Sequence, residues 1–158
     1  MDLNIRKAKS SDMKSVLELI QELATFEKQP AAVEITEQTL IQDGFGEKPA
    51  FEVLLAESED EIIGMALFYP RYSTWKGKAL HLEDLIIKNK FRGKGVGTAL
   101  YRKVMEYAYN NGLKRVAWEV LDWNTPAIEF YESTGARVFS EWRVAQIDEK
   151  ALENYVKK

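Results

Sequence analysis

The sequence contains no cysteine and only one histidine among its 158 residues. The absence of cysteine excludes disulfide bonds and thiolate metal sites. No apolar run approaches the ~20 residues that a membrane-spanning helix needs, and the N-terminus lacks the apolar core of a signal peptide. The formal net charge of −3 argues against non-specific binding to nucleic acid and favours a cationic small partner. We therefore expect a cytoplasmic protein that binds neither nucleic acid nor membrane.

What the chain does contain is typical of a folded domain. Hydrophobic residues make up 46% and charged residues 30% of the sequence, which is ordinary for a globular protein. A chain of this length buries roughly two-thirds of its unfolded surface on folding. No repeat, low-complexity tract or linker interrupts it. We therefore expect a single domain that spans residues 1–158.

Hydrophobic periodicity predicts alternating strands and helices. The expected strands are 3–8, 51–56, 62–69, 78–87, 115–121 and 138–147. Helices are expected from a cap at 10–12 to about 28, from 36 to Gly44, from 96 to 111, from a cap at Asn124 to Gly135, and at 151–156. Pro70 is expected to end a strand pair and 71–77 to form a loop. This order predicts a mixed sheet flanked by helices in one α/β sandwich.

A glycine-rich stretch lies between the expected strand 78–87 and the expected helix 96–111. It reads Lys-Asn-Lys-Phe-Arg-Gly-Lys-Gly-Val-Gly from Lys88 to Gly97. Glycine permits positive φ values and close approach of a ligand, and main-chain N–H groups at a helix start bind anions. The spacing is that of neither the dinucleotide fingerprint nor the P-loop. The stretch predicts a pyrophosphate cradle, and the alternative is a glycine-rich turn that binds nothing.

Two motifs carry a resemblance to a known family. Arg92-x-x-Gly95-x-Gly97 resembles the acetyl-CoA loop of the GNAT N-acyltransferase superfamily, and the stretch from Asn124 to Gly135 resembles its Asn-x-x-Ala-x-x-Phe-Tyr-x-x-x-Gly signature. Shorter stretches resemble the spermidine/spermine (diamine) N-acetyltransferases, namely Leu23-Ala-x-Phe-Glu27, Asp43-Gly-Phe-Gly46, Trp75-x-Gly-Lys78 and Leu82-Glu-Asp84. The likeness covers nearly the whole chain and weakens near 137–141 and in the tail.

The resemblance implies a fold and a co-substrate. The implied fold is a GNAT-like α/β fold, with a mixed, mostly antiparallel central sheet flanked by helices. Two of its strands, here 85–87 and 116–120, would splay apart beside the glycine-rich loop. The implied co-substrate is acetyl-CoA, with no metal. Residues implied to bind it are Leu85, Ile86, Ile87, Arg92, Gly93, Lys94, Gly95, Val96, Gly97, Thr98, Asn124, Pro126, Ala127 and Tyr131.

Acetyl transfer from a thioester to an amine requires two proton movements. A primary alkyl amine has a pKa near 10.4, so its deprotonation at pH 7 costs about 4–5 kcal/mol. The leaving thiol has a pKa of about 8.5, and a tyrosine hydroxyl can protonate it. The resemblance implies that Tyr131 is this acid; the alternative is that Phe130 and Tyr131 are core residues. Without cysteine or a suggested Ser-His pair, direct attack by the amine is favoured over a covalent intermediate.

Glu83 is the second implied catalytic residue, as ligand of the amine and water-mediated proton acceptor. By the two-residue period it is expected to share a face with His81, Leu85 and Ile87; the alternative is a surface charge at the strand end. A carboxylate that binds an ammonium also raises the ammonium's pKa, so a water relay is needed to reconcile the two roles. His81 is expected to be structural.

The implied substrate-binding residues are mostly acidic or aromatic. Phe26 stands where the family commonly has tyrosine, and Trp118 is expected either to attract cations or to pack in the core. The full set is Phe26, Glu27, Glu83, Asp84, Trp118 and Glu119.

The sequence thus predicts an acetyl-CoA-dependent N-acetyltransferase that acts on a primary amine of a small polycation such as spermidine or spermine. One alternative acceptor is a lysine-like amino acid such as thialysine. An alternative of another class is a catalytically silent acyl-CoA-binding module. Relatives are homodimers, so the resemblance also implies a homodimer.

Overall fold

A computed structural model describes residues 1–158, and the chain separates into two compact units, Met1–Glu119 and Val120–Lys158. The first unit contains the sheet and helices α1 (Met13–Phe26), α2 (Glu37–Phe45) and α3 (Val96–Asn110). The second contains helices α4 (Thr125–Ser133) and α5 (Glu149–Val156). No helix combines the length and the apolar character needed to cross a membrane. The expected single domain stays a prediction.

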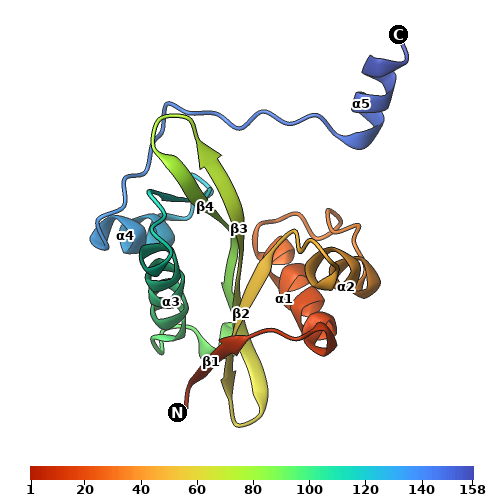
Figure 1. The fold of residues 1–158 in the computed structure, drawn as a ribbon. Helices are drawn as coiled ribbons and strands as arrows, with labels where there is room; N and C mark the ends of the chain where they lie inside the picture. Colours follow the sequence, from red (N-terminus) through yellow and green to blue (C-terminus); the bar gives the residue numbers. More distant parts are fainter. The chain divides into compact units, whose positions relative to one another are not determined.

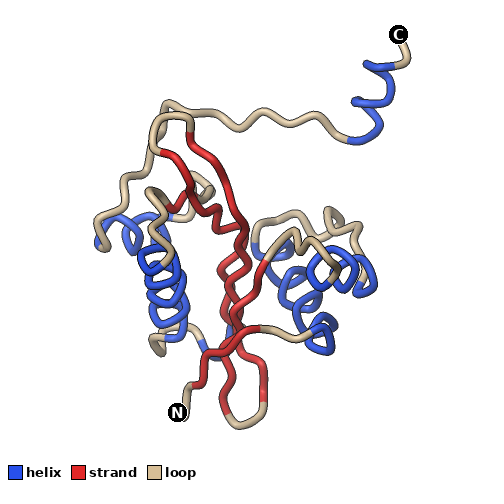
Figure 2. Tube along the Cα trace, in the orientation of Figure 1, coloured by secondary structure: helices blue, strands red, loops and turns tan.

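The sheet of the first unit has five strands in sequential order. The strands are drawn in red in Figure 2. All neighbouring strands pair antiparallel except the last two, which are parallel. This arrangement confirms the expected mixed, mostly antiparallel α/β fold. The strands are β1 (Asn4–Lys7), β2 (Glu52–Ser58), β3 (Glu61–Ser73), β4 (Gly77–Ile87) and β5 (Val116–Ala117).

Helices cover both faces of this sheet (Figure 1). On one face, which we call the α1 side, residues of α1 and α2 pack against β2, β3 and β4 in a core of Met13, Val16, Leu19, Leu40, Val53, Leu55, Met65, Leu67 and Ile86. On the other face, the α3 side, the buried residues are Ala56, Ile63, Ala66, Phe68, Leu80, Leu82, Val96, Leu100, Val104 and Ala108. Each fully buried side chain of the size of leucine stabilises the fold by about 1.5–3 kcal/mol.

The β3–β4 hairpin is longer than the sequence suggested. We expected Pro70 to end the strand pair, but β3 continues to Ser73 and Pro70 lies opposite Leu80. The pairing of β2 with β3 ends at Phe68, so Pro70 has a neighbouring strand only on the β4 side. The N–H of Leu80 donates to Arg115 O at 2.9 Å, away from β3. Proline therefore interrupts no ladder hydrogen bond here, and the strand passes through it.

The parallel pair β4–β5 is short. Only Leu80–Val116 and His81–Ala117 pair, although β4 continues to Ile87 and a strand was expected over 115–121. The edge of β4 after His81 therefore has no strand beside it on the β5 side. The strand expected over 116–120 as the second member of a splayed pair thus ends at Ala117, and residues 118–120 form no strand.

Two further expectations about local structure, for 138–147 and Gly44, were wrong, and the expected cap of α4 at Asn124 was right in position but not in its side-chain contact. Residues 138–147 form no strand, because they pair with no other segment. The side chain of Asn124 makes no capping hydrogen bond to α4, although Pro126 stands in the first turn as expected. Helix α2 passes through Gly44 and ends before Gly46, whereas its expected cap, Thr36, does accept from the Thr39 N–H at 3.1 Å.

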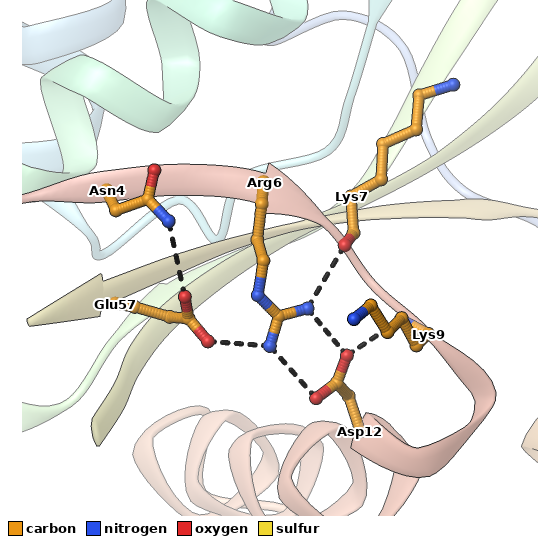
Figure 3. A network of polar contacts seen from close by, with 6 residues as sticks. All are labelled: Asn4, Arg6, Lys7, Lys9, Asp12 and Glu57. Atoms are coloured by element: carbon orange, nitrogen blue, oxygen red, sulfur yellow. Dashed lines mark hydrogen bonds and ion pairs between the residues drawn. The ribbon is translucent and has the colours of Figure 1, made fainter. Parts of the chain in front are cut away.

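A network of polar contacts ties the start of the chain to the sheet, and we call it the Arg6 network (Figure 3). Arg6 of β1 donates to both carboxylate oxygens of Asp12 at 2.7 and 3.0 Å and to Glu57 of β2 at 2.6 Å. The Asp12 carboxylate also accepts the Lys9 N–H at 2.7 Å. Hydrogen bonds from Arg6 lower the pKa of both Asp12 and Glu57. One guanidinium thus pairs with two carboxylates just before α1 begins.

Candidate active site

The glycine-rich loop between β4 and α3 uses two glycines for their backbone conformation. Gly93 has φ +73° and Gly95 has φ +82°, values that residues with a side chain rarely adopt. A Cβ at either position would meet no atom within 4 Å, so the backbone there is open on its outer side. Gly97 has no positive φ; a Cβ at Gly97 would lie 3.5 Å from the Ile87 side chain. This third glycine lies where α3 begins close to the end of β4.

Helix α3 begins with backbone donors that no helical carbonyl accepts. Its first helical hydrogen bond runs from the Ala99 N–H to Gly95 O at 3.0 Å. The three N–H groups before it, of Val96, Gly97 and Thr98, precede the helical ladder, and Gly95 offers no side chain to cap them. Together with the positive end of the helix dipole, these donors form a site suited to an anion such as a pyrophosphate.

Arg92 connects this loop to the end of α1. Its Nε–H donates to Ile87 O at 3.1 Å, and its guanidinium lies 4.8 Å from the centroid of the Phe26 ring. Lys94 lies over the Phe91 ring at 5.3 Å. The structure therefore brings Arg92, expected on the co-substrate side, into contact with Phe26, expected on the acceptor side.

The unpaired edge of β4 lies just before the loop. The side chains of Leu85 and Ile87 pack against the α3-side core, and Ile86 belongs to the α1-side core. Because these side chains are committed to packing, the edge offers main-chain groups to a ligand that runs along it. The resemblance implied that residues 85–87 bind acetyl-CoA, and this stays a prediction.

Glu83 occupies a β-bulge, where β4 has one more residue than β3. Leu67 pairs with Asp84 and Phe68 with Leu82, so Glu83 has no partner residue. The bulge shifts the alternation: Leu85 and Ile87 pack on the α3 side, whereas His81 stacks with Tyr69 of the α1-side core at 5.2 Å between ring centroids. Our expectation that Glu83 shares a face with Leu85 and Ile87 was therefore wrong. Bulges re-aim side chains in this way near functional sites.

Two neighbours converge on one oxygen of Glu83. The Tyr69 hydroxyl donates to Oε2 at 2.7 Å, and His81 Nε2 lies 3.3 Å from the same atom. Burial, with the nearby charge of Glu83, raises the pKa of Tyr69 to about 12, so Tyr69 stays a donor. The side chain of Glu83 is 50% exposed. Its Oε1 receives neither contact and remains available to a substrate.

Two more carboxyl groups lie near Glu83 and, with it, form what we call the acidic cluster: Glu27, Glu83 and Asp84. Burial, then repulsion by Glu83 and Glu27, raises the pKa of Asp84 to about 6. Burial also raises the pKa of Glu27, at the C-terminal end of α1. Neither Glu27, Glu83 nor Asp84 has a lysine or arginine partner. Such a cluster suits a cationic ligand, because an ammonium would relieve the mutual repulsion.

The other two expected substrate residues, Trp118 and Glu119, are consecutive in the chain and have different neighbours. Trp118 meets Tyr101 of α3 edge-to-face at 5.7 Å and packs on the α3 side, which supports the core-packing alternative. Glu119 influences the pKa of Tyr69, which places its charge within electrostatic reach of the Glu83 neighbourhood.

The second unit carries the remaining expected residues. Asn124 immediately precedes α4, and its carbonyl accepts the first helical hydrogen bond from the Ile128 N–H at 3.1 Å. Pro126, Ala127 and Tyr131 follow on the helix, where the Tyr131 ring contacts Phe130 at 5.5 Å. The structure groups these four residues on and beside α4.

Sequence reasoning missed Tyr69 and Arg71 and assigned His81 a purely structural role. Arg71 Nη1 lies 3.4 Å from His81 Nδ1, so Arg71, His81 and Glu83 form a chain of contacts. Arg71 was missed because the hairpin was expected to end at Pro70, and Arg71 reaches His81 only when β3 continues alongside β4. Tyr69 lay inside the expected strand 62–69, but its contact with Glu83 occurs at the bulge, which the sequence did not predict. The chain has no group of three or more histidine or acidic side chains arranged to hold a metal ion.

Comparison with known proteins gives one family. The model of the Acetyltransferase (GNAT) family matches residues 13–136. Thialysine N-epsilon-acetyltransferase of Bos taurus is 38% identical over 159 aligned positions, covering 94% of each chain. Spermidine/spermine N(1)-acetyltransferase-like protein 1 of Homo sapiens is 32% identical over 94% of this chain and 23% of its own length. An integron cassette protein from the mobile metagenome of V. cholerae shares the fold, with a TM-score of 0.81 at 23% identity, covering 100% of this chain and 99% of that one.

Proposed function

The chain belongs to the acetyltransferase (GNAT) family, and from this premise we propose that it moves the acetyl group of acetyl-CoA to a primary amine of a small cationic substrate by direct attack. The names of similar proteins support two acceptor classes, polyamines such as spermidine and lysine-like amino acids such as thialysine. Acetyl-CoA supplies the activated acetyl thioester. Every other part of the chemistry falls to the residues of this chain.

The observation that carries the proposal is the sequence of features along β4 and into α3. Glu83 lies at the bulge within β4, and from there to Ile87 the edge of β4 on the β5 side has no neighbouring strand. After the loop, α3 begins with the free N–H groups of Val96, Gly97 and Thr98. An amine, an extended pantetheine arm and a diphosphate would find suitable partners in that order. Arg92 and Lys94 add positive charge beside the diphosphate position.

Glu83 and Tyr131 have distinct proposed roles. Glu83, held through Oε2, would accept the proton of the bound ammonium at Oε1 directly or through a water molecule. Tyr131 would donate its hydroxyl proton to the departing thiolate. Glu27 and Asp84 would hold further positive charge on the acceptor, with Phe26 and Glu119 near the same end. We further propose that the protein is cytoplasmic, as the composition of the sequence predicts, and that it is a homodimer, as the family resemblance implies.

A thiol-release assay with acetyl-CoA and a panel of amines tests the proposed function. The panel contains spermidine, spermine, putrescine, thialysine, lysine and ornithine, and calorimetry with CoA runs in parallel. We expect thiol release with at least one of these amines and binding of CoA in their absence. Binding of CoA without turnover on any amine would contradict the proposed activity and would favour the alternative, a catalytically silent acyl-CoA-binding module.

Substitution of Gly95 by valine tests the anion site separately. A β-branched residue at φ +82° is strained, so the N–H groups at the start of α3 would be displaced. We expect the KM for acetyl-CoA to rise about tenfold or more, because strain of this kind costs about 1–3 kcal/mol. Gly112→Val, at φ +67° after α3, is the matched control for strain at a helix terminus. Equal effects of both variants on the KM for acetyl-CoA would contradict a role of the loop in binding the co-substrate.

Tyr131→Phe tests the proposed acid. The variant should lower kcat by about 100-fold, the lower end of the range for general acid catalysis, and leave CoA affinity nearly unchanged. Phe130→Leu, at the neighbouring position of α4, controls for altered packing of the helix. Turnover of Tyr131→Phe at the wild-type rate would exclude Tyr131 from the mechanism.

A further inference from the structure

One cation lies among the residues that surround Glu83. Direct pairing of Tyr69 with His81 and the two-residue alternation of β3 place Arg71, Tyr69 and His81 on one face of the hairpin. Tyr69 reaches Glu83 from this face, and both Glu83 and Arg71 influence the pKa of Tyr69. Arg71 therefore belongs to the surroundings of the acceptor end.

Arg71 forms no ion pair, although carboxylates lie nearby. Its one polar contact is the 3.4 Å approach of Nη1 to His81 Nδ1, and its side chain is exposed. Other basic residues of the first unit do pair with acids, such as Arg6 with Asp12 and Glu57, or Lys88 and Lys90 with Glu61. A guanidinium has five donors, so most of those of Arg71 remain for a ligand.

His81 lies between Arg71 and Glu83. A guanidinium can only donate, so Nδ1 of His81 is the acceptor of the Arg71 contact, and Nε2 on the other side of the ring faces Glu83 Oε2. The imidazole thereby separates a cation from an anion on one surface. Arg71 presents positive charge on one side of the ring and Glu83 presents negative charge on the other.

This arrangement suits a substrate that carries both charges. A polyamine has ammonium groups along its whole length, and one of them would meet Arg71 with repulsion. An amino acid with a side-chain amine has an ammonium at one end and, at the other, a carboxylate beside the α-ammonium. Arg71 can bind that carboxylate through two parallel N–H donors while Glu83 holds the reacting amine.

We infer that Arg71 binds the carboxylate of the acceptor, and that the preferred acceptors are amino acids with a primary amine on the side chain. The inference rests on the proposed acetyl transfer and selects one of its two acceptor classes. It assigns Arg71 as a specificity-determining residue.

The test uses two acceptors that differ only in the carboxylate. Thialysine is compared with bis(2-aminoethyl) sulfide, the diamine that remains when its carboxylate is removed, and kcat/KM is measured for both. We expect the wild type to use thialysine at least about tenfold better. Arg71→Gln should lower kcat/KM for thialysine about 10- to 100-fold, the effect of losing a hydrogen bond between charged groups, and leave the diamine within about twofold.

Two further variants sharpen the result. Lys78→Gln removes the same charge from the same hairpin, and alternation places Lys78 with Leu80 and Leu82 on the α3 side, so both acceptors should keep their wild-type values. Arg71→Lys keeps the charge without the planar fork and should recover part of the preference for thialysine.

The possible outcomes separate the inference from the proposed function. Equal use of both acceptors by the wild type, or equal losses for both in Arg71→Gln, would overturn the role of Arg71 while leaving acetyl transfer to amines intact. Absence of thiol release with either acceptor and with every amine of the panel would overturn the proposed function and the inference together.

Discussion

Two groups of carboxylates in the first unit differ in their surroundings. In the Arg6 network, Asp12 and Glu57 share one guanidinium, and its hydrogen bonds lower the pKa of both. In the acidic cluster, Glu27 and Asp84 have no cationic partner, and burial raises the pKa of both. The first group stabilises the fold when it is charged. The charged forms of Glu27 and Asp84 lower the free energy of unfolding, as expected for groups in a site that binds a cation.

The sign of each contribution follows from the direction of the pKa shift. Asp12 and Glu57 have lowered values in the folded protein, so their contribution is present above their unfolded pKa of about 4 and is lost as the pH falls. Asp84 has a raised value of about 6. Its contribution is therefore favourable below about pH 4 and is lost as the pH rises through 6. The two groups should thus respond to pH in opposite directions.

The largest expected effect is that of Glu83→Gln. The amide keeps the size of the side chain and removes the proton acceptor, so kcat/KM for the amine should fall by about 100-fold or more. Calorimetry should show nearly unchanged affinity for CoA. A proportionate loss of amine turnover and CoA binding would indicate misfolding and would leave Glu83 without a catalytic role.

Glu57→Gln is the matched control from the Arg6 network. It removes the same charge from a carboxylate that Arg6 holds, so it should reduce stability and leave kcat/KM of the folded enzyme unchanged. Denaturation by urea and the thiol-release assay measure the two effects on the same sample. A fall in kcat/KM as large as that of Glu83→Gln would abolish the distinction between the two groups.

Asp84→Asn should stabilise the protein at alkaline pH. A pKa raised to about 6 corresponds to at most about 3 kcal/mol of destabilisation by the charged form, so we expect a gain of about 1–3 kcal/mol at pH 8. The gain should vanish near pH 4, where the folded wild type is already protonated at Asp84. Urea unfolding at both pH values measures it, and a destabilised variant at pH 8 would show that the charge is satisfied in the fold.

The smallest expected effect, with the opposite sign, is that of Asp12→Asn. Loss of a charged acceptor from a partly exposed pair with Arg6 should cost about 1–2 kcal/mol at pH 7. The cost should shrink as the pH falls below about 4, because Asp12 then becomes protonated in the unfolded wild-type chain, whereas Arg6 lowers its pKa in the folded protein. Urea unfolding at pH 7 and pH 3 checks this, and a cost that does not depend on pH would mean that the ion pair contributes nothing.

The features of this protein that depend on main-chain conformation were predictable from the sequence. The spacing of Gly93, Gly95 and Gly97 after a strand led to the left-handed turns and the uncapped start of α3, because backbone conformation of this kind depends on local residues. The fold and its mostly antiparallel sheet followed in the same way from local periodicity and from the family resemblance.

The side-chain part of the candidate site was predictable only in part. Glu83 could be named, but its bulge depends on the register with β3, and a register shift changes which face a residue occupies. Tyr69 contacts Glu83 at this bulge, and Arg71 contacts His81 through strand pairing beyond Pro70, which local rules treated as a stop. The expected strand 138–147 failed for a related reason, since alternating apolar residues form a strand only where a partner strand exists.

The most direct measurement of the central claim is the number of protons released when an amine binds. Thialysine and spermidine are titrated calorimetrically into the CoA complex at pH 6, in buffers of different ionisation enthalpy. If the acidic cluster holds the ammonium, binding should ionise Asp84 and release about half a proton per site, because Asp84 is near its midpoint at this pH. The release should disappear in Asp84→Asn. Binding of either amine without proton release, or with the same release in the variant, would contradict the account.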